Sequence, residues 1–328
     1  MPEAGSVDVV LCAYNGQRYV GEQLRSVLAQ TRPVDRVLVR DDGSTDATLD
    51  EVARCAAEAP GLVHAVRNER NLGFAGNFAA GLAAAQADVV FFCDQDDVWE
   101  PEKVRLLLEL LQSSGADMVF SDGVAIDAGG ARIPGPTVLQ ALELEPAALD
   151  GFARRAWDEL VRRNVVNGAA CAVRRRVAQA ALPVPPGMAH DYWLALWCAA
   201  HGGVAATART LYRYRQHGAN VIGMGSQRRL WQWLGVWRQP RRPRRRELAL
   251  WRLVCERLLP LLPEARRASL REKLAFLEET VGTPARTSRA VAILRHLARG
   301  SYRRFAPPWA LARDLIGLLR DPDRGAAP

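Results

Sequence analysis

The chain has 328 residues, of which 49% are hydrophobic, enough apolar material for a packed core in one large domain or two smaller ones. This composition excludes a chain that is disordered as a whole. Lys and Arg outnumber Asp and Glu by 44 to 36, giving a net charge of +8 and a pI near 9.6. Such a balance favours anionic partners such as nucleotides, phosphates or an acidic membrane surface.

The six cysteines are scattered singly, without the paired spacing of a zinc site or the density of a disulfide scaffold. We therefore expect reduced thiols and a cytoplasmic protein. The N-terminus lacks the basic and apolar regions of a secretory signal, and there is no uncharged apolar run of about 18 residues or more that would span a bilayer. These observations predict a protein that is soluble or peripheral to a membrane.

Strands and helices alternate through the first part of the chain. The hydrophobic pattern predicts strands over 7–13, 36–40, 62–66 and 89–93, and helices over 19–30, 44–59 and 78–86, with a polar loop over 68–77. This alternation is typical of a parallel, doubly wound sheet with right-handed crossovers. The sequence therefore predicts an α/β fold with a nucleotide-binding type of layer architecture.

The remaining elements are less regular. The pattern predicts a helix over 103–112, a strand over 117–122, a Gly- and Pro-rich mobile loop over 127–136, a turn and strand over 167–173, helices over 177–181 and 190–200, and strands over 204–207 and 211–215. From Gln227 onward the chain becomes Arg-rich and Trp-containing. We place a boundary near residues 222–228, which gives an α/β domain over 1–225 and a helical region over 226–328.

A buried strand ends in three acids at Asp94, Asp96 and Asp97. Carboxylates this close repel one another unless a positive charge lies among them, and hard oxygen ligands favour Mg²⁺ or Mn²⁺. A divalent ion that bridges to phosphate is one explanation. A solvated turn in which Asp97 caps a following helix is the other, and the motif alone does not choose between them.

A second acidic turn, Asp41-Asp42-Gly43-Ser44, follows another strand of the same predicted sheet. Both turns would lie at the carboxyl edge of that sheet, where open α/β sheets bind ligands. An Asp at the end of an early strand can accept hydrogen bonds from a base or ribose. A tight turn followed by a helix cap is the alternative, which Gly43 and Ser44 also fit.

Several of these motifs, taken in order, resemble the family 2 glycosyltransferases of GT-A fold, and within them the rhamnosyltransferase-like branch of bacterial polysaccharide assembly. The resemblance covers about residues 6 to 222 and rests on Leu11-Cys12-Ala13-Tyr14-Asn15-Gly16, Asp41-Asp42-Gly43-Ser44-Thr45-Asp46, Asn71-Leu72-Gly73, Asn77-Phe78 and Asp94-Gln95-Asp96-Asp97. It implies a Rossmann-like, mostly parallel sheet flanked by helices, to which this chain adds a C-terminal helical region.

The resemblance also implies roles for residues at the sheet edge. Tyr14 and Asp42 match positions that contact the nucleobase, with Asp41 as a neighbouring candidate. Asp94 matches the acid that faces the ribose or metal and Asp96 the acid that binds the metal. Asp97 is an alternative metal ligand, and Arg70, Asn71 and Asn77 fall in the loop that lines the donor's diphosphate.

Two later segments complete the implied site. Asp191, in His190-Asp191-Tyr192-Trp193, matches the catalytic base of inverting members, although many members have an acid where this chain has His190. Read without the family, Asp191 would be a helix N-cap. His217 resembles the late histidine that completes the metal shell, and its place after a strand and before Gly218 favours that role over a surface position.

The C-terminal region lies outside the resemblance. Trp231, Trp233 and Trp237 beside Arg238–Arg246, and the stretch Tyr302–Leu319 with Trp309, have the composition of interfacial helices on anionic lipid. The plainer reading is a helix core with a solvated basic face. We hold peripheral contact with the inner face of the membrane through residues 227–328 as a hypothesis.

Together these features predict an inverting, metal-dependent glycosyltransferase that uses Mg²⁺ or Mn²⁺. It would move a sugar, with rhamnose favoured, from a nucleoside diphosphate donor to a glycan or lipid-linked acceptor, and would bind no nucleic acid. Two alternatives come from other classes. A nucleotidyltransferase acting on sugar phosphates would need a Gly-rich basic loop that the segment Tyr14–Gln17 does not provide, and a basic nucleic-acid-binding protein would leave the acidic turns unexplained.

Overall fold

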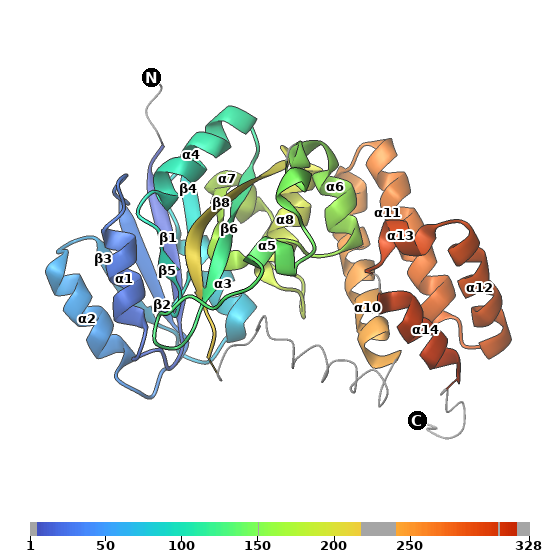
Figure 1. Cartoon of the computed structure of the whole chain (residues 1–328), viewed down its shortest axis with the longest axis horizontal. Helices are drawn as coiled ribbons and strands as arrows, with labels where there is room; N and C mark the ends of the chain where they lie inside the picture. The colour runs from blue at the N-terminus through green and yellow to red at the C-terminus, as the bar shows by residue number, and fades with distance from the viewer. Residues whose placement is uncertain (1–4, 150, 218–240, 308, 320–328) are drawn as a thin grey trace. The chain divides into compact units, whose positions relative to one another are not determined.

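The computed structural model describes residues 5–149, 151–217, 241–307 and 309–319 (Figure 1). The chain divides into two compact units. The first comprises residues 1–157, 165–184 and 188–222, and the second comprises 158–164, 185–187 and 223–328. The boundary predicted between residues 225 and 226 lies outside the described residues and stays a prediction.

The first unit is built on one mixed sheet of eight strands in the order β3-β2-β1-β4-β7-β6-β8-β5. The strands are β1 (Val7–Ala13), β2 (Arg36–Asp41), β3 (Val63–Arg67), β4 (Val89–Asp94), β5 (Val98–Trp99), β6 (Met118–Ile126), β7 (Cys171–Arg174) and β8 (Val204–Arg215). The first four strands run parallel, whereas β7 is antiparallel to both β4 and β6. The predicted α/β architecture with a mostly parallel nucleotide-binding half is confirmed.

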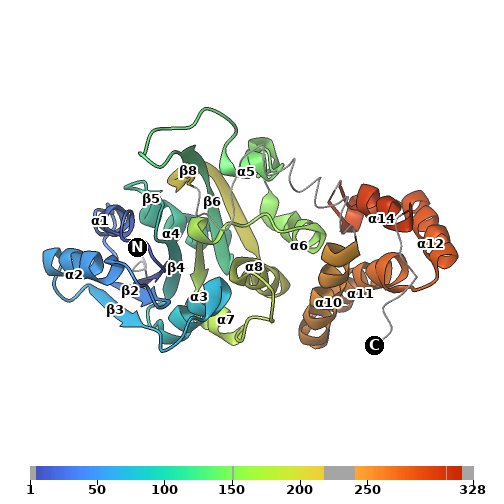
Figure 2. The ribbon, with the colours of Figure 1, turned by 90° about the horizontal axis from the view of Figure 1, so that it is seen from below.

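Helices cover both faces of this sheet. They are α1 (Val20–Leu28), α2 (Thr48–Glu58), α3 (Gly73–Ala84), α4 (Lys103–Ser114), α5 (Val138–Ala141), α6 (Phe152–Arg162), α7 (Arg175–Ala180) and α8 (His190–Ala200), with short 3₁₀ turns at Pro146–Ala148 and Gly168–Ala170. Helix α3 packs on β1 and β2 and against α7 and α8, while α1 and α4 lie on the opposite face (Figure 2). Because both faces are covered, β1 and β4 are apolar on both sides.

The structure differs from the sequence prediction in several places, among them the start of α2 at Thr48 and the end of β6 at Ile126. Helix α3 begins at Gly73 and not at Phe78, so the second half of the predicted loop is helical. The strands predicted over 204–207 and 211–215 are one strand, β8, because it pairs with β6 across a bulge at Ser121–Gly123. The short strand β5 and the helices α5 and α6 were not predicted.

The second unit is helical. It contains α10 (Arg241–Leu258), α11 (Glu264–Leu277), α12 (Arg286–Ala298), α13 (Ser301–Phe305) and α14 (Trp309–Leu319), with a 3₁₀ turn at Leu259–Leu261 and a π-helical turn at Glu278–Gly282. Within the parts of the chain that the structure describes, no helix combines the length and apolarity needed to cross a bilayer. The tryptophans Trp231, Trp233 and Trp237 lie outside these parts.

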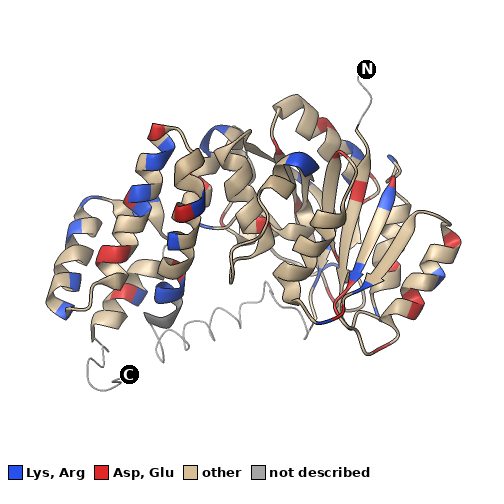
Figure 3. Cartoon of the chain, turned by 180° about the vertical axis from the view of Figure 1, so that it is seen from behind, with Lys and Arg blue, Asp and Glu red and all other residues tan. Residues whose placement is uncertain are grey.

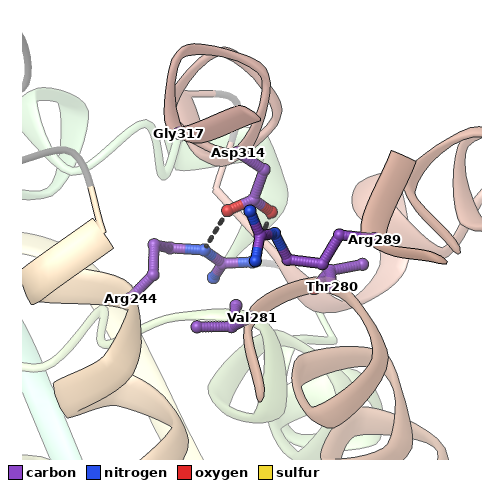
Figure 4. Close-up of a pocket in the computed structure, with 6 residues that line it drawn as sticks. All are labelled: Arg244, Thr280, Val281, Arg289, Asp314 and Gly317. Atoms are coloured by element: carbon purple, nitrogen blue, oxygen red, sulfur yellow. Dashed lines mark hydrogen bonds and ion pairs between the residues drawn. The ribbon is translucent and has the colours of Figure 1, made fainter. Parts of the chain in front are cut away.

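A buried ion pair joins two helices of this unit. Arg244 of α10 donates to both carboxylate oxygens of Asp314 in α14, with Nε–Oδ1 and Nη2–Oδ2 distances of 3.0 Å each (Figure 4). Tyr302 donates its hydroxyl to the same carboxylate at 2.8 Å. Nearby, Lys273 is fully buried and lies 3.2 Å from Glu247. Buried charges are tolerated because they are paired and hydrogen-bonded.

Candidate active site

The carboxyl ends of β1, β2 and β4 meet at one edge of the sheet. In the parallel register Cys12 of β1 is beside Asp94 of β4, and Ala13 is beside Asp41 of β2. The turns that follow these three strands are therefore neighbours. This is the edge at which open α/β sheets bind ligands.

Gln95 ties the turn after β4 to the turn after β1. Its Oε1 accepts from the Tyr14 backbone N–H at 2.8 Å, and its Nε2 donates to the Tyr14 carbonyl at 3.0 Å. A Cβ atom on Gly16 would lie 2.0 Å from that Oε1, so a larger residue at position 16 would force the Gln95 amide to move. The Tyr14 side chain itself is exposed beside this clamp.

Asp41 closes its own turn. Its Oδ2 accepts from the backbone N–H groups of Ser44 at 3.0 Å and Gly43 at 3.3 Å, and the Ser44 hydroxyl donates to Oδ1. The side chain is fully buried. The turn-forming alternative therefore describes Asp41 well, and its part in donor binding stays a prediction.

Asp42 holds the start of a helix that lies thirty residues later in the chain. Its Oδ1 accepts from Leu72 N at 2.7 Å and Asn68 Nδ2 at 2.8 Å, and its Oδ2 accepts from Gly73 N at 2.9 Å. A carboxylate is stabilised at a helix N-terminus by the unpaired N–H groups and the helix dipole. This contact explains why α3 begins at Gly73, before the predicted position.

Two of the three residues assigned to the diphosphate loop hold that loop in place. Asn71 donates its Nδ2 to the Asp42 carbonyl at 3.0 Å. Asn77 is buried, donates to the Arg40 carbonyl at 2.9 Å and accepts from Asn68 at 2.8 Å. Arg70 is exposed on the same loop. Their contact with a donor stays a prediction.

The acidic turn is partly buried, and the charges of its carboxylates act on one another. Burial, then the neighbouring charges of Asp96 and Asp191, raise the pKa of Asp94 to about 8. Burial and the same turn's carboxylates raise the pKa of Asp97 well above its usual value. The site therefore favours a bound positive charge, which would lower both pKa values.

Asp97 is an interior anchor and does not cap a helix. Its Oδ1 accepts from Arg215 N at 3.0 Å, and its buried Oδ2 has no hydrogen-bond partner among the described residues. Strand β5 follows it, and the N-cap of α4 is Glu102. The helix-cap alternative for this turn is therefore wrong.

His217 lies against the acidic turn, and its role as a metal ligand stays a prediction. Its Nε2 is 2.8 Å from Asp96 Oδ2, and its ring stacks on Tyr19 with the centroids 5.0 Å apart. Arg215, two residues earlier, is buried, donates Nε to the Asp96 carbonyl at 2.8 Å and lies 2.6 Å from Glu22. Arg215 was not predicted as a site residue. Its position as a basic residue at the end of an apolar strand was the signal that could have indicated it.

Lys103 is a second basic residue that the sequence analysis missed. It is fully buried, donates to the Ala169 carbonyl and lies over the Trp99 ring at 4.1 Å. Burial lowers its pKa to about 8, while the negative charges of Asp97 and Asp94 act in the opposite direction. A buried cation thus partly balances the acidic turn from within the protein. As one of only two lysines in the chain, it carried no pattern that could have revealed this place.

Asp191 lies near the acidic turn although the two are far apart in sequence. The charge of its carboxylate is one cause of the raised pKa of Asp94, so the two groups share one electrostatic environment. Helix α8 begins at His190 with Ala189 as its N-cap, so Asp191 stands inside the first turn and is not the N-cap. The N-cap alternative is wrong.

His190 fills an aromatic pocket beside Asp191. Its ring stacks on Phe78 at 4.0 Å and meets the edges of Phe74 and Phe92 at 5.0 Å and 5.2 Å. Neither ring nitrogen has a hydrogen-bond partner in the described part of the chain, and burial lowers the pKa of His190 to about 3. The imidazole is therefore neutral at any pH near 7.

A family model supports the resemblance that the motifs carry. The model described as "Glycosyl transferase family 2" matches residues 8–179, which contain both acidic turns and the first seven strands. The chain belongs to glycosyl transferase family 2. The segments that hold Asp191 and His217 lie beyond the matched range.

Curated relatives agree with membership of family 2. An uncharacterized glycosyltransferase (alr2836) of Nostoc sp. is 30% identical over 225 residues, which are 65% of this chain and 66% of the relative. A dTDP-rhamnosyl transferase (RfbG) of Shigella flexneri is 27% identical over 126 residues, 37% of this chain and 44% of the relative. The match thus spans no more than about two thirds of the length of these relatives.

Solved structures share the GT-A fold of this family 2 chain. S. aureus TarS 1-349 in complex with UDP-GlcNAc aligns with a TM-score of 0.59 at 16% identity, covering 96% of this chain and 89% of that one. The mannosyltransferase PcManGT from Pyrobaculum calidifontis, in complex with GDP-Man and Mn²⁺, aligns with a TM-score of 0.54 at 17% identity, covering 97% and 88%. The predicted fold, including the presence of C-terminal helices, is confirmed.

The residues at the sheet edge of this family 2 chain carry the ligand atoms that a hard divalent cation takes. Asp94, Asp96 and His217 supply carboxylate oxygens and an imidazole nitrogen, and the raised pKa of Asp94 means that its ionised form is disfavoured without a nearby positive charge. Within the described residues, no three His, Cys, Asp or Glu side chains are already gathered closely enough to hold a metal. In this structure Asp96 and His217 pair with each other instead.

Proposed function

We propose that the protein is an inverting glycosyltransferase. It moves a sugar from a nucleoside diphosphate donor to a hydroxyl group of a glycan or lipid-linked acceptor in the synthesis of a cell-surface polysaccharide. The observation that carries the proposal is the electrostatic coupling of Asp191 with Asp94, because it joins the implied base to the implied donor site. Family membership and the sugar-nucleotide complexes of the similar folds support it.

In the proposed reaction Asp191 acts as the general base. Its carboxylate takes the proton from the acceptor hydroxyl while that oxygen bonds to the anomeric carbon. The bond between the anomeric carbon and the diphosphate breaks on the opposite face, which inverts the configuration, and the nucleoside diphosphate leaves with the bonding electron pair. His190 is neutral and buried next to this base, so it adds no positive charge that would hold Asp191 ionised.

Asp94, Asp96 and His217 would hold Mg²⁺ or Mn²⁺, and Asp97, which anchors the turn through its Oδ1, stays the alternative ligand. The ion would offset the charge that develops on the leaving diphosphate. Tyr14 and Asp42, with Asp41, would form the nucleobase side, and Arg70, Asn71 and Asn77 the diphosphate side. Rhamnose is the sugar that we favour, and the partial similarity to a dTDP-rhamnosyl transferase supports it.

Neither alternative function has a specific observation in its favour. A nucleotidyltransferase would need a Gly-rich basic loop at the segment Tyr14–Gln17. That segment lies within the match to the glycosyltransferase family model. The excess of basic residues that suggested nucleic acid is not in the unit that contains the candidate site, since the described residues of that unit, 5–149, 151–157, 165–184 and 188–217, hold 19 Lys and Arg against 23 Asp and Glu.

Two variants test the proposal. The donor is first identified by thermal shift against UDP-, dTDP- and GDP-sugars with and without Mn²⁺, because a ligand of the native state raises its apparent stability. Asp191→Asn should keep donor binding and lower transfer by about 100-fold to 10,000-fold. Asp96→Ala should lose the metal-dependent part of donor binding. Full transfer by the Asp191→Asn variant would refute the base assignment.

A further inference from the structure

Helix α12 is apolar on its outer face as well as on its inner face. Its buried side is formed by Arg289, Ala292, Ile293 and His296. On the other side Val291, Leu294 and Leu297 are 62%, 64% and 48% exposed. Spacings of three residues place these three side chains on neighbouring turns of one helix. An ordinary surface helix would carry polar side chains there.

Helix α14 repeats this arrangement. Ala310, Asp314 and Gly317 face the interior, whereas Leu315 and Leu319 are exposed on the opposite side. At its start the exposed Trp309 carries Arg313 over its ring at 4.4 Å. Helices α12 and α14 pack against each other, so the apolar positions belong to one small region of the second unit.

The charge of this region is mainly positive. Residues 286–307 and 309–319 contain seven arginines and a single acid, Asp314, which is buried and paired with Arg244. Among the arginines, Arg289 is buried, and Arg295 and Arg304 pair with Glu279 and Glu272. The described part of the helical unit from residue 241 to 319 contains 18 Lys and Arg but only 7 Asp and Glu. Figure 3 shows these charged residues along the ribbon. The net positive charge of the chain is thus concentrated in this unit.

We propose that this apolar-arginine surface, formed by Val291, Leu294, Leu297, Trp309, Leu315 and Leu319 with the arginines of α12 to α14, docks on an anionic phospholipid membrane. Lipid acyl chains would take up the apolar side chains. The lipid phosphates would pair with arginines, whose long aliphatic stems let the charged heads stay at the headgroup level. The proposal concerns membrane location and does not depend on which sugar the other unit transfers.

Charge and apolarity together favour this occupant over two others. A second copy of the chain would bring the same mainly positive surface against this one, and like charges repel one another. A nucleic acid would match the arginines but offers no apolar phase for leucine and valine side chains. An anionic bilayer satisfies both features at once.

The test is sedimentation of the full-length chain with vesicles in the absence of any sugar donor. We expect binding to vesicles of equal parts phosphatidylcholine and phosphatidylglycerol, weak binding to phosphatidylcholine alone, and loss of binding as salt is raised. Val291→Gln/Leu294→Gln should weaken binding by about tenfold or more, because two apolar anchors are lost without a change of charge. Both positions are exposed, so the melting temperature should not change.

Leu261→Gln is the matched control. Leu261 is 52% exposed in the turn before α11, outside the proposed surface, and its replacement should leave vesicle binding unchanged. Absence of binding to anionic vesicles would overturn the proposal, as would equal losses in the control and the double variant. A self-association in sedimentation velocity that the double variant abolishes, without vesicle binding, would overturn it in favour of an interface between two copies. Because no donor is present, a failed transfer reaction would leave these outcomes unaffected.

Discussion

The side-chain amide of Gln95 pairs with the backbone of Tyr14 as a neighbouring strand would. Its Oε1 accepts from the Tyr14 N–H at 2.8 Å, and its Nε2 donates to the Tyr14 C=O at 3.0 Å. The pairing fixes the turn after β1 to the acidic turn after β4. It therefore sets the distance between the segment that contains Tyr14, the proposed nucleobase contact, and the proposed cation site.

Replacement of Gly16 tests this clamp. Gly16→Ala would place a Cβ atom 2.0 Å from Gln95 Oε1, so the amide must move, and we expect a loss of about 1–3 kcal/mol in the free energy of unfolding. In the double variant Gly16→Ala/Gln95→Ala the clash is absent, so its loss should be smaller than the sum of the two single losses. Chemical denaturation of the four proteins measures the coupling, and strictly additive losses would contradict the clamp.

His190 predicts a pH dependence of stability. Burial lowers its pKa from 6.5 to about 3, so below pH 6.5 the unfolded chain binds a proton that the folded chain does not. The stabilisation is complete above pH 6.5 and is lost toward pH 3, with a slope of about 1.4 kcal/mol per pH unit from this group. His190→Leu should remove that slope in denaturation curves taken at several pH values. His64→Leu, at an exposed position, is the control and should retain it.

Gly168 predicts a separation of binding from transfer. A Cβ atom there would lie 2.9 Å from His190 Nε2 and 3.6 Å from Asp191 Oδ2. Gly168→Ala should therefore push the His190 ring away, whereas the 3.6 Å to Asp191 is an ordinary contact. Asp191 adjoins His190 in α8, so a shift of His190 should displace the base and slow transfer by about 100-fold. Donor binding should stay near that of the unchanged protein, because the donor turns are elsewhere on the sheet edge. A folded Gly168→Ala protein with full transfer would show that the position of Asp191 is not critical.

The helical unit offers a comparison of a buried and an exposed ion pair. Asp314→Ala removes the carboxylate that Arg244 contacts in α14 and leaves Glu247 as a remaining ion-pair partner. We expect a loss of about 3 kcal/mol in the stability of this unit, the lower end for a broken buried pair. Glu278→Ala breaks the exposed pair with Arg252 and should cost about 0–1 kcal/mol. Hydrogen exchange of the backbone amides of α10 measures both losses. Equal losses would mean that the buried pair does not hold α10 to α14.

Elements set by local pattern were predicted well. The bounds of β1, Val7–Ala13, and of α8, His190–Ala200, agree with the prediction because each is defined by its own apolar residues and by the turn or helix start next to it. The neighbouring acidic turns followed from the parallel order of the strands. The family resemblance added His217, whose contact with Asp96 no local pattern indicates.

Features that depend on distant partners were not predictable from one sequence. The continuity of β8 is decided by its pairing with β6, whose paired residues lie 86 to 89 positions earlier in the chain. Lys103 and Arg215 are single basic residues in apolar surroundings, and their burial beside the acidic turn depends on how the sheet and helices close around them. Long-range packing, not propensity, decides such positions.

The bond between Asp42 and the start of α3 links ligand binding to local folding. The amide protons of Leu72 and Gly73 are held by the same carboxylate that the family resemblance assigns to the nucleobase. A donor that hydrogen-bonds to the Asp42 carboxylate must therefore either share this acceptor with the two amides or break their hydrogen bonds to it. Hydrogen exchange at Leu72 and Gly73 thus becomes a reporter of donor occupancy that is read from the backbone, without any measurement of sugar transfer.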